Sequence, residues 1–353
     1  MKIKLAILEK DTSYLARIVT SLNIKYPDKL EVYSFTDYKT VIDILEESKI
    51  DVLIASDTFE VETNKLPKRC GFAYFVDSSD IDSVCGQAAI CKFQKIDLIY
   101  RQILSLYSEN ASNISGIRFD EDNCKVIEFV SVSGGTGGST MAAACAMSYA
   151  RKRKKTLYVN LEILGTTNIF FNNEGQFDMS DIIYALKSRK SNITLKLESC
   201  VRQNDSGVYY FSRPKVALDM MELETDEVLR LISELKSSCN YDYIIIDMDF
   251  GLKKGFIDIY RQAHSVVVVG DGTDVSNAKI LSAYQSLEKL EQGMDISILN
   301  RMCVIYNKFS NKTGKLVENT GLRMLGGAPR FEHATTKQIA EQLSKMEIFD
   351  ELM

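Results

Sequence analysis

The sequence has few of the residues that build zinc sites. It contains two histidines, His264 and His333, and its eight cysteines are scattered along the chain with no CxxC pair. Structural and catalytic zinc is usually held by Cys and His at short, repeated spacings. The composition therefore argues against a zinc site, and we expect free thiols in a reducing cytoplasm.

Long apolar runs are also missing. No segment approaches the ~20 consecutive apolar residues that a membrane-spanning helix needs. The start, Met1-Lys2-Ile3-Lys4, does not have the pattern of a signal peptide, and the last residues, 345–353, have an acidic balance that disfavours anionic lipid. We therefore expect a cytoplasmic protein without membrane insertion.

Positive charge is in slight deficit, with 43 basic and 48 acidic residues and a net charge of −5. This balance argues against broad nucleic-acid binding. The basic run 151–155 is the exception, and we interpret it as the solvated end of a helix, with a DNA-binding patch as the alternative. The length of 353 residues predicts two domains, each able to bury its own core.

A glycine-rich segment is the most informative feature that is present. It spans residues 133–140, follows the apolar strand 126–132, and leads directly into a helix of small residues from Met141. Glycines allow the backbone to turn with its N–H groups inward, and the helix adds its free N–H groups and dipole. The pattern predicts a phosphate cup, with Ser139 also a candidate Mg²⁺ ligand. Its candidate binding residues are Gly134, Gly135, Thr136, Gly137, Gly138, Ser139 and Thr140. The alternative is a glycine-rich turn without a ligand.

This loop resembles the deviant Walker A motif of MinD/ParA ATPases, Lys-Gly-Gly-x-Gly-Lys-Ser/Thr. Ser133 and Gly138 stand where that family carries its two lysines. In the family the first lysine reaches the partner's nucleotide across a dimer and the second grips the β- and γ-phosphates. Their loss implies weaker nucleotide binding and slow hydrolysis. Because backbone donors remain, the resemblance still implies ATP and Mg²⁺ as cofactors.

Two further strands carry candidate catalytic carboxylates. Residues 156–162 resemble the family's second strand, which ends Asp-x-Asp; here Asn160 and Glu162 take those positions, and Glu162 is the candidate for positioning the attacking water. Residues 241–247 resemble the Walker B strand, with Asp247 holding Mg²⁺ through water. The alternatives are a solvated strand end for Glu162 and a turn-capping role for Asp247.

The adenine side of the expected site rests on two residues. The strand 302–308 ends Asn-Lys, as in the family, where the Asn amide reads the adenine edge; Asn307 takes that position. Pro329 matches the proline whose backbone lies beside the base. A helix cap or turn is the alternative role for Asn307.

The first hundred residues alternate strands with amphipathic helices. Strands are expected at 3–8, 31–35, 51–55, 72–76 and 88–91, and a helix at 96–106, which implies a parallel sheet covered on both faces. This resembles a response-regulator receiver domain. Glu9 and Asp11 match its acidic pocket and Lys92 its lysine, but Ser56 stands at the phosphoacceptor position. Residues 77–92 are too few for a full fourth helix. We interpret the domain as a pseudo-receiver for docking, with phosphorylation at Asp57 as the alternative.

The sequence thus predicts an α/β protein with a receiver-like (flavodoxin-like) parallel-sheet domain at 1–107, a linker at 108–123, and a P-loop MinD/ParA-like parallel-sheet domain at 124–353. This combination resembles the CpaE/TadZ group. The resemblance implies an ATP-binding homodimer, a weak ATPase at most, that acts with Tad secretion and pilus components and positions Tad-type machinery at the cell pole. A ParA-type DNA-partitioning ATPase and a phosphorylation-responsive regulator are the alternatives.

Overall fold

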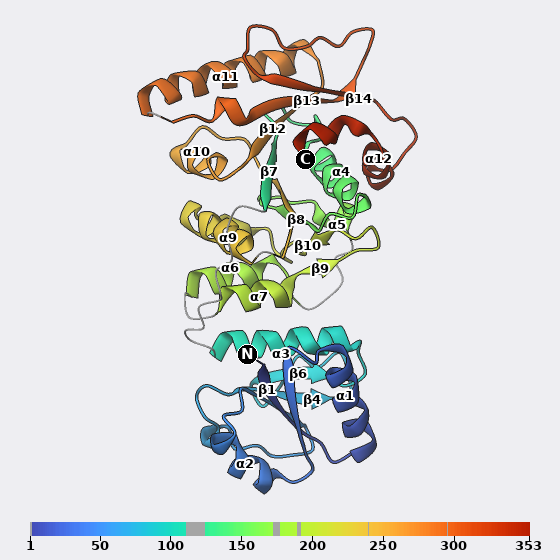
Figure 1. Ribbon diagram of the computed structural model, residues 1–353, viewed down its shortest axis with the longest axis vertical. Coiled ribbons are helices and arrows are strands. Elements are labelled where there is room, and N and C mark those ends of the chain that lie inside the picture. Colours follow the sequence, from blue (N-terminus) through green and yellow to red (C-terminus); the bar gives the residue numbers. More distant parts are fainter. Residues whose placement is uncertain (1, 111–123, 172–176, 189–191, 239, 295) are drawn as a thin grey trace. The chain divides into compact units, whose positions relative to one another are not determined.

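The computed structural model describes residues 2–110, 124–171, 177–188, 192–238, 240–294 and 296–353 (Figure 1). The chain forms two compact units, residues 1–115 with 188–199 and residues 116–187 with 200–353. Most of the linker expected at 108–123 lies outside the described residues. The domain boundary at this linker therefore stays a prediction.

The first unit is built on a six-stranded sheet in the order β2-β1-β3-β4-β6-β5. All neighbours are parallel except β5 and β6, which form an antiparallel edge. Its elements are β1 (Ile3–Leu8), α1 (Thr12–Lys25), β2 (Leu30–Phe35), α2 (Tyr38–Glu47), β3 (Val52–Ser56), η1 (Thr63–Lys65), β4 (Gly71–Val76), β5 (Ser83–Val84), β6 (Gln87–Cys91) and α3 (Ile96–Asn110).

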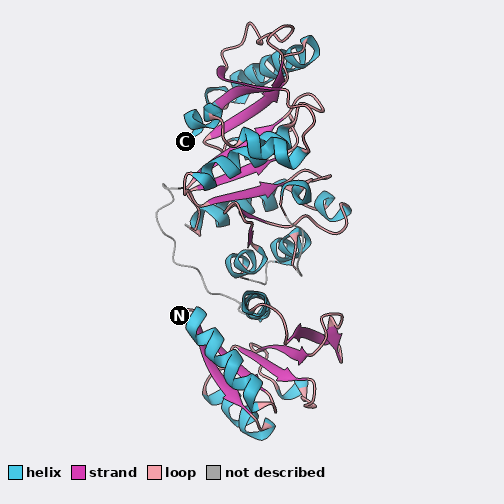
Figure 2. Ribbon diagram, turned by 90° about the vertical axis from the view of Figure 1, so that its right-hand side faces the viewer, coloured by secondary structure: helices cyan, strands magenta, loops and turns pink. Residues whose placement is uncertain are grey.

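Both faces of this sheet are covered, as the alternation of strands and helices predicts. Leu5 and Ile7 of β1 pack into a core with α1 and α3, whereas Ala6 and Leu8 pack into a second core with α2. Successive side chains of a strand point to opposite faces, so one apolar strand supplies both cores. Figure 2 shows helices on both sides of the strands. The receiver-like fold expected from the sequence is confirmed.

The segment between Asp77 and Lys92 forms a short hairpin in place of a fourth covering helix. Cys85 and Gly86 make its turn with φ of 50° and 76°, which joins β5 to β6. The short span predicted the missing helix but not the small strand β5. At the other end of the unit, α3 continues to Asn110, beyond the expected end at Leu106.

A helix from the second half of the sequence belongs to the first unit. Residues 188–199, which include most of α7 (Ile193–Cys200), cluster with it. The Asn192 backbone N–H donates to the Ser108 carbonyl over 3.0 Å, and the buried Lys196 Nζ donates to Ser105 Oγ over 2.9 Å. The sequence pattern did not predict this assignment.

The second unit is built on an eight-stranded sheet in the order β14-β13-β12-β7-β11-β8-β10-β9. All neighbours are parallel except β9 and β10. Its strands are β7 (Lys125–Val130), β8 (Thr156–Asn160), β9 (Arg202–Gln203), β10 (Tyr209–Tyr210), β11 (Tyr243–Asp247), β12 (Ser265–Gly270), β13 (Met302–Phe309) and β14 (Arg323–Pro329).

The helices of the second unit lie on both faces of this sheet (Figure 1). They are α4 (Gly138–Arg151), α5 (Thr167–Phe170), α6 (Met179–Ser188), α8 (Leu218–Met221), α9 (Thr225–Ser237), α10 (Lys254–Tyr260), α11 (Asp274–Met294) and α12 (Thr336–Leu343), with short 3₁₀ turns at η3 (Leu299–Arg301) and η4 (Glu347–Leu352). No helix in the described part of the chain has the length and apolar character to cross a membrane.

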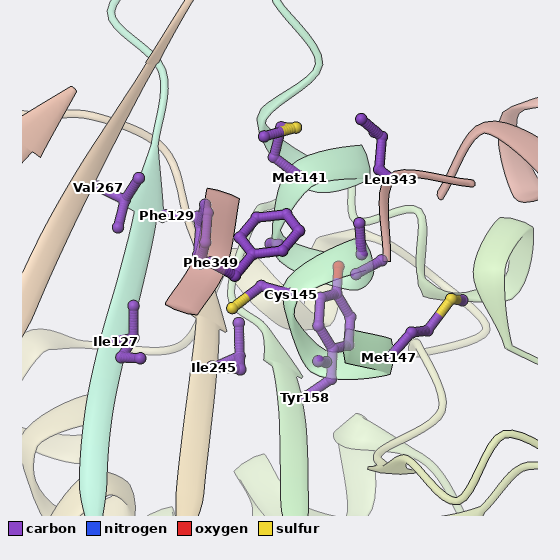
Figure 3. Close-up of a cluster of buried hydrophobic side chains, with 14 of the residues drawn as sticks. Ile127, Phe129, Met141, Cys145, Met147, Tyr158, Ile245, Val267, Leu343 and Phe349 are labelled. Atoms are coloured by element: carbon purple, nitrogen blue, oxygen red, sulfur yellow. The ribbon is translucent and has the colours of Figure 1, made fainter. Parts of the chain in front are cut away.

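Helix α4 is the centre of the second core. Residues 141–149 are all buried, and their small side chains allow the helix to lie close against the sheet. Cys145 packs near Ile127, Phe129 and Phe349 (Figure 3). The Tyr149 hydroxyl donates to the Phe349 carbonyl over 3.0 Å, so the last segment of the sequence is part of the core. This packing fixes the start of α4, and with it the glycine-rich loop, at the carboxyl end of β7.

Candidate functional site

The glycine-rich loop has the backbone conformation that its sequence predicts. Gly135 and Gly137 have φ of 78° and 90°, in the left-handed region that favours glycine, and α4 begins at Gly138 with Gly137 as its N-cap. A Cβ on Gly137 would lie 2.3 Å from Asn307 Nδ2. That amide donates to the Thr136 carbonyl over 2.9 Å. Asn307, near the end of β13, therefore holds the loop in place.

Two hydroxyl groups of the loop have different partners. Thr136 is fully buried, and its Oγ1 lies 3.1 Å from Ser131 Oγ and 3.3 Å from the Ser133 carbonyl oxygen. Ser139 is on the first turn of α4, and its Oγ donates to Glu162 Oε2 over 3.1 Å. Thr136 thus fixes the loop internally, while Ser139 connects it to the candidate catalytic carboxylate.

The candidate carboxylates from β8 and β11 meet in one hydrogen-bond network. Asp247 Oδ2 accepts from Tyr158 OH and from Asn160 Nδ2, each over 2.7 Å. Asn160 Nδ2 also lies 3.2 Å from Glu162 Oε2, and the Glu162 backbone N–H donates to Asn160 Oδ1 over 3.0 Å. The structure therefore brings together Ser139, Glu162 and Asp247, as the motif spacing predicts.

Both carboxyl groups are shifted toward their neutral forms. Burial raises the pKa of Asp247, and the negative charge of Glu162 raises it further. Burial also raises the pKa of Glu162, although the hydrogen bonds from Asn160 and Ser139 act in the opposite direction. A cation placed between the two groups would relieve this repulsion, which is the condition for a metal site.

The loop opens onto a cavity of about 430 Å³, a volume in the range of ligand-binding clefts. Its lining residues are Phe129, Ser131, Ser133–Thr140, Glu162, Thr166, Ile169, Phe170, Asp247, Met248, Asp249 and Thr336. Three of these are carboxylates, Glu162, Asp247 and Asp249, and no lysine or arginine is among the lining residues that the structure describes.

The two residues expected at the adenine side are not in this lining. Asn307 is buried and contacts the underside of the loop, and its Oδ1 accepts from the Lys308 backbone N–H over 3.0 Å. Pro329 is exposed at the end of β14, opposite Phe309 of β13. Base reading by Asn307 and Pro329 stays a prediction.

The basic run that ends α4 is partly engaged with the end of the sequence. Lys152 forms an ion pair with Asp350, and Arg151 Nη1 donates to Ser344 Oγ over 3.4 Å. Both contacts lie within the second unit. They agree with a helix end packed on its own domain.

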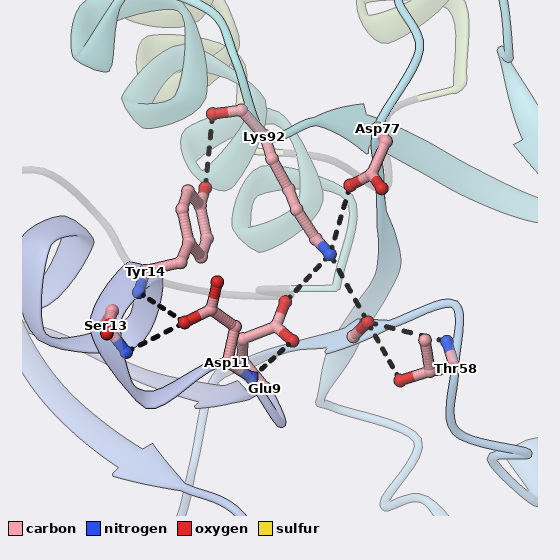
Figure 4. A network of polar contacts seen from close by, with 8 residues as sticks. Glu9, Asp11, Ser13, Tyr14, Thr58, Asp77 and Lys92 are labelled. Carbon is pink, nitrogen blue, oxygen red and sulfur yellow. Dashed lines mark hydrogen bonds and ion pairs between the residues drawn. The ribbon is translucent and has the colours of Figure 1, made fainter.

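In the first unit, the acidic pocket is closed by a lysine (Figure 4). Lys92 Nζ lies 3.0 Å from Glu9 Oε2 and 3.2 Å from Asp77 Oδ1. Burial by itself lowers the pKa of Lys92, but the hydrogen bonds and charges of Glu9 and Asp77 outweigh it and raise the pKa. The lysine thus occupies the pocket as a permanent cation. Asp11 instead caps α1, accepting from the backbone N–H groups of Ser13 and Tyr14.

Ser56 lies at the base of the same pocket. It is fully buried, and its Oγ is 3.1 Å from Thr58 Oγ1 and 3.5 Å from Lys92 Nζ. Asp57, one residue further, is exposed and makes no side-chain hydrogen bond or ion pair within the described residues. The pocket therefore presents a hydroxyl where a receiver domain presents its phosphoacceptor carboxylate.

A protein-family model described as TadZ-like, receiver domain, matches residues 1–108. The first unit contains a TadZ-like receiver domain. In the pocket of this domain, Lys92 lies between two carboxylates and Ser56 lies at the base. Comparison with curated protein sequences gives no match.

Solved structures that resemble the chain include a ParA family ATPase, MinD and a plasmid partition protein. A ParA family ATPase from Chlorobium tepidum is 24% identical with a TM-score of 0.53, over 64% of this chain and 98% of that one. MinD in the MinC:MinD cell division complex of Aquifex aeolicus is 20% identical with a TM-score of 0.51, over 65% and 96%. A plasmid partition protein from Borrelia burgdorferi, solved bound to AMPPNP, is 17% identical with a TM-score of 0.50, over 66% and 100%.

These likenesses show the fold of the second unit. A TadZ-like receiver domain followed by a MinD/ParA-like parallel-sheet domain is consistent with the CpaE/TadZ group. Both expectations of fold from the sequence are confirmed.

The site's donor set fits a nucleotide with its Mg²⁺. The loop supplies the glycine cradle and the start of a helix, and Ser139 and Asp247 are the hydroxyl and carboxylate suited to a hydrated Mg²⁺. Among the described residues there is no group of three or more His, Cys, Asp or Glu arranged to hold a metal ion by itself. The metal would therefore be held jointly with phosphate oxygens and water, as it is in P-loop nucleotide-binding proteins.

Two residues of the site were not singled out from the sequence. Tyr158 lies in β8, two positions before Asn160 and so on the same side of the strand. This spacing is the signal that could have indicated its contact with Asp247. Asp249, two residues after Asp247, also lines the cavity.

Proposed function

We propose that this chain is an ATP-binding, dimeric localisation factor that positions Tad-type pilus or secretion machinery at the cell pole, with slow or absent hydrolysis. The observation that carries the proposal is the glycine cradle of the loop, which opens onto a 430 Å³ cavity beside Ser139, Glu162 and Asp247. The TadZ-like receiver domain at residues 1–108 supports the link to Tad machinery.

Nucleotide binding without the family's lysines rests on the backbone and on Mg²⁺. The first N–H groups of a helix have no partner within the helix, so the start of α4 at Gly138 offers donors and the positive end of its dipole to an anion. The carboxylates that line the cavity would repel a free polyphosphate, so binding depends on the metal that they help to hold. The plasmid partition protein from Borrelia burgdorferi, which shares the fold, was solved bound to AMPPNP, and this supports the assignment.

Slow hydrolysis follows from the charge of the cavity. Catalysis of phosphoryl transfer is mostly electrostatic, and a lysine or arginine on the transferred group contributes a large part of it. No such side chain lines the cavity in the described residues, and Glu162 Oε2 is engaged by Ser139 and Asn160. We therefore expect the bound nucleotide to act mainly as a switch that stabilises the dimer.

Isothermal titration of the full chain with ATP and Mg²⁺ tests the nucleotide part, and light scattering tests the dimer. Binding is expected with Mg²⁺ and not with EDTA, together with a doubling of mass. Ser139→Ala is expected to weaken binding, whereas Ser286→Ala, which removes a hydroxyl that donates to the Ser282 carbonyl within α11, is not. No heat and no change in mass with ATP in large excess would contradict the proposal.

A fluorescent fusion tests the localisation part. The fusion is expected to form a focus at the cell pole, and the Tad components are expected to lose their polar position when the chain is deleted. If ATP controls the dimer, a fusion that carries Ser139→Ala is expected to form weaker polar foci, and Tad components are expected to lose part of their polar position in cells with this variant. A fusion that stays diffuse, or Tad components that keep their place without the chain, would contradict this part.

A further inference from the structure

The phosphate cavity is short of positive charge. Its lining has three carboxylates and, among the described residues, no lysine or arginine. Ser133 and Gly138 leave the loop itself without a cationic side chain. Even with one Mg²⁺ present, a polyphosphate in this cavity would lie close to acidic side chains without a cationic one. A cation close to the loop would therefore have a large effect on the affinity for the polyphosphate.

Lys308, at the end of β13, is in direct contact with the loop. Its Nζ donates to the Gly135 carbonyl over 2.7 Å. Within the described residues no other lysine or arginine hydrogen-bonds to residues 133–140. The Lys308 side chain is also exposed, and its Nζ lies at the backbone of the loop and not in the lining of the cavity.

The backbone at Lys308 has two unusual features that affect the direction of its side chain. Lys308 has φ of 56°, in the left-handed region that costs a non-glycine residue about 1 kcal/mol or more. The pairing of β13 with β14 shifts register between Tyr306 and Phe309, the two residues that flank Asn307 and Lys308. Such a bulge changes the direction of a side chain at the end of a strand.

The strained conformation is held in place by Asn307. Its Oδ1 accepts from the Lys308 backbone N–H over 3.0 Å, while its Nδ2 donates to the Thr136 carbonyl. One buried amide therefore couples the position of Lys308 to the position of the loop. Strain that is fixed by surrounding contacts is characteristic of functional sites.

We propose that Lys308 supplies the positive charge of this phosphate loop. It would act in place of the two lysines that are absent because Ser133 and Gly138 stand at their positions. The inference rests on the proposed function, because it requires that the loop bind a nucleotide. Lys308 acts as a positioning residue: it fixes the Gly135 carbonyl and adds positive potential at the loop. The effect is directed at the phosphates, so it grows with the number of phosphate groups in the ligand.

The test is titration of the full chain with ATP, ADP and AMP in the presence of Mg²⁺, for the wild type, Lys308→Gln and Lys308→Arg. Gln removes the charge and keeps a polar end, whereas Arg keeps the charge. For Lys308→Gln we expect ATP to bind about tenfold more weakly, which is about 1.4 kcal/mol, with a smaller loss for ADP and the smallest for AMP. Lys308→Arg is expected to retain most of the ATP affinity.

A matched control is Lys315→Gln. Lys315 is an exposed lysine a few residues further along the chain, paired with Asp274 over 3.1 Å, and its replacement is expected to leave all three affinities unchanged. The ATP affinity of the wild type is also expected to fall with salt more steeply than that of Lys308→Gln, because the variant has one fewer charge interaction that salt can screen.

The outcomes separate the two proposals. If the wild type binds none of the three nucleotides, the proposed function fails. If the wild type binds ATP and Lys308→Gln binds it equally well, only the inference about Lys308 fails. An equal loss of affinity for ATP and AMP, or a loss in Lys308→Arg as large as in Lys308→Gln, would show a purely structural role and would also overturn the inference.

Discussion

The Tyr158 hydroxyl donates a hydrogen bond of 2.7 Å to Asp247 Oδ2. The two residues come from neighbouring parallel strands, β8 and β11, and both are buried. Asn160 Nδ2 donates to the same oxygen. The Walker B-like carboxylate is therefore held by two neutral donors from one strand, in the position where it lines the cavity beside the glycine-rich loop.

Replacement of Tyr158 by Phe is expected to destabilise the second unit by about 1–3 kcal/mol, because a buried carboxylate loses one of its donors. Urea denaturation measures the change. Tyr243→Phe is the control: Tyr243 is buried in the adjacent strand β11, and its hydroxyl makes no hydrogen bond within the described residues. Equal effects of the two variants would contradict a specific role of the Tyr158 hydroxyl.

Glu128, in β7, is expected to make stability depend on pH. It is fully buried, and neither of its Oε atoms has a hydrogen-bond partner within the described residues. Burial raises the pKa of Glu128 to about 8, from 4.5. Between these values the carboxyl is neutral in the folded chain and ionised in the unfolded chain. Stability present at acid pH is therefore lost as pH rises to about 8, by up to about 1.4 kcal/mol per pH unit.

Denaturation at pH 5 and pH 8 measures this effect. Because Asp247 and Glu162 also have raised pKa values, the relevant quantity is the difference between the wild type and Glu128→Gln. The variant is expected to lose less stability than the wild type between the two pH values. Equal losses would show that the Glu128 carboxyl keeps the same protonation state in both forms.

Gly137 is expected to be intolerant of a side chain. Gly137→Ala combines a φ of 90° with a Cβ only 2.3 Å from Asn307 Nδ2, so it should cost about 2 kcal/mol and weaken ATP binding. Gly134→Ala is the matched variant in the same loop, since its Cβ would meet nothing within 4 Å and its φ is not in the left-handed region. Gly134→Ala is expected to leave stability nearly unchanged, as measured by urea denaturation. A Gly137→Ala chain as stable as Gly134→Ala would refute the packing argument.

In the receiver domain, Lys92→Met is expected to be strongly destabilising. It would leave the buried Glu9 carboxylate without its cation, at a cost of about 3 kcal/mol. Lys25→Met breaks a pair with Asp97 in which both side chains are about half exposed, so its cost should be below about 1 kcal/mol. The two variants are compared by denaturation, and equal destabilisation would contradict the distinction.

Phosphoryl transfer to the receiver domain is not expected. Ser56 replaces the acceptor carboxylate, Asp57 is exposed outside the pocket, and Lys92 is already engaged by Glu9 and Asp77. Incubation with acetyl phosphate and Mg²⁺ should give no labelled protein by mass spectrometry. Labelling that disappears in Asp57→Asn would instead support a phosphorylation-responsive regulator.

Several features could be predicted from the sequence because they depend on residues close together in the chain. The parallel strands follow from short apolar runs, and the loop follows from glycines at Gly135 and Gly137, where positive φ is needed. The position of Ser139 follows from its place on the first turn of the helix. The meeting of Glu162 with Asp247 also follows, since the carboxyl ends of parallel strands share one edge of a sheet.

Other features arise only in the tertiary structure. The contact of Lys308 with Gly135 joins residues 173 positions apart, and it depends on a register shift in β13 and on a left-handed backbone that no local pattern indicates. The contact of Tyr158 with Asp247 depends on the register between β8 and β11. Sequence alone thus determined the central strands, the glycine turn and the chemistry of the loop, because backbone propensity is local. Folding decided which charges reach that loop, because strand register and bulges are set by the packing of the whole sheet.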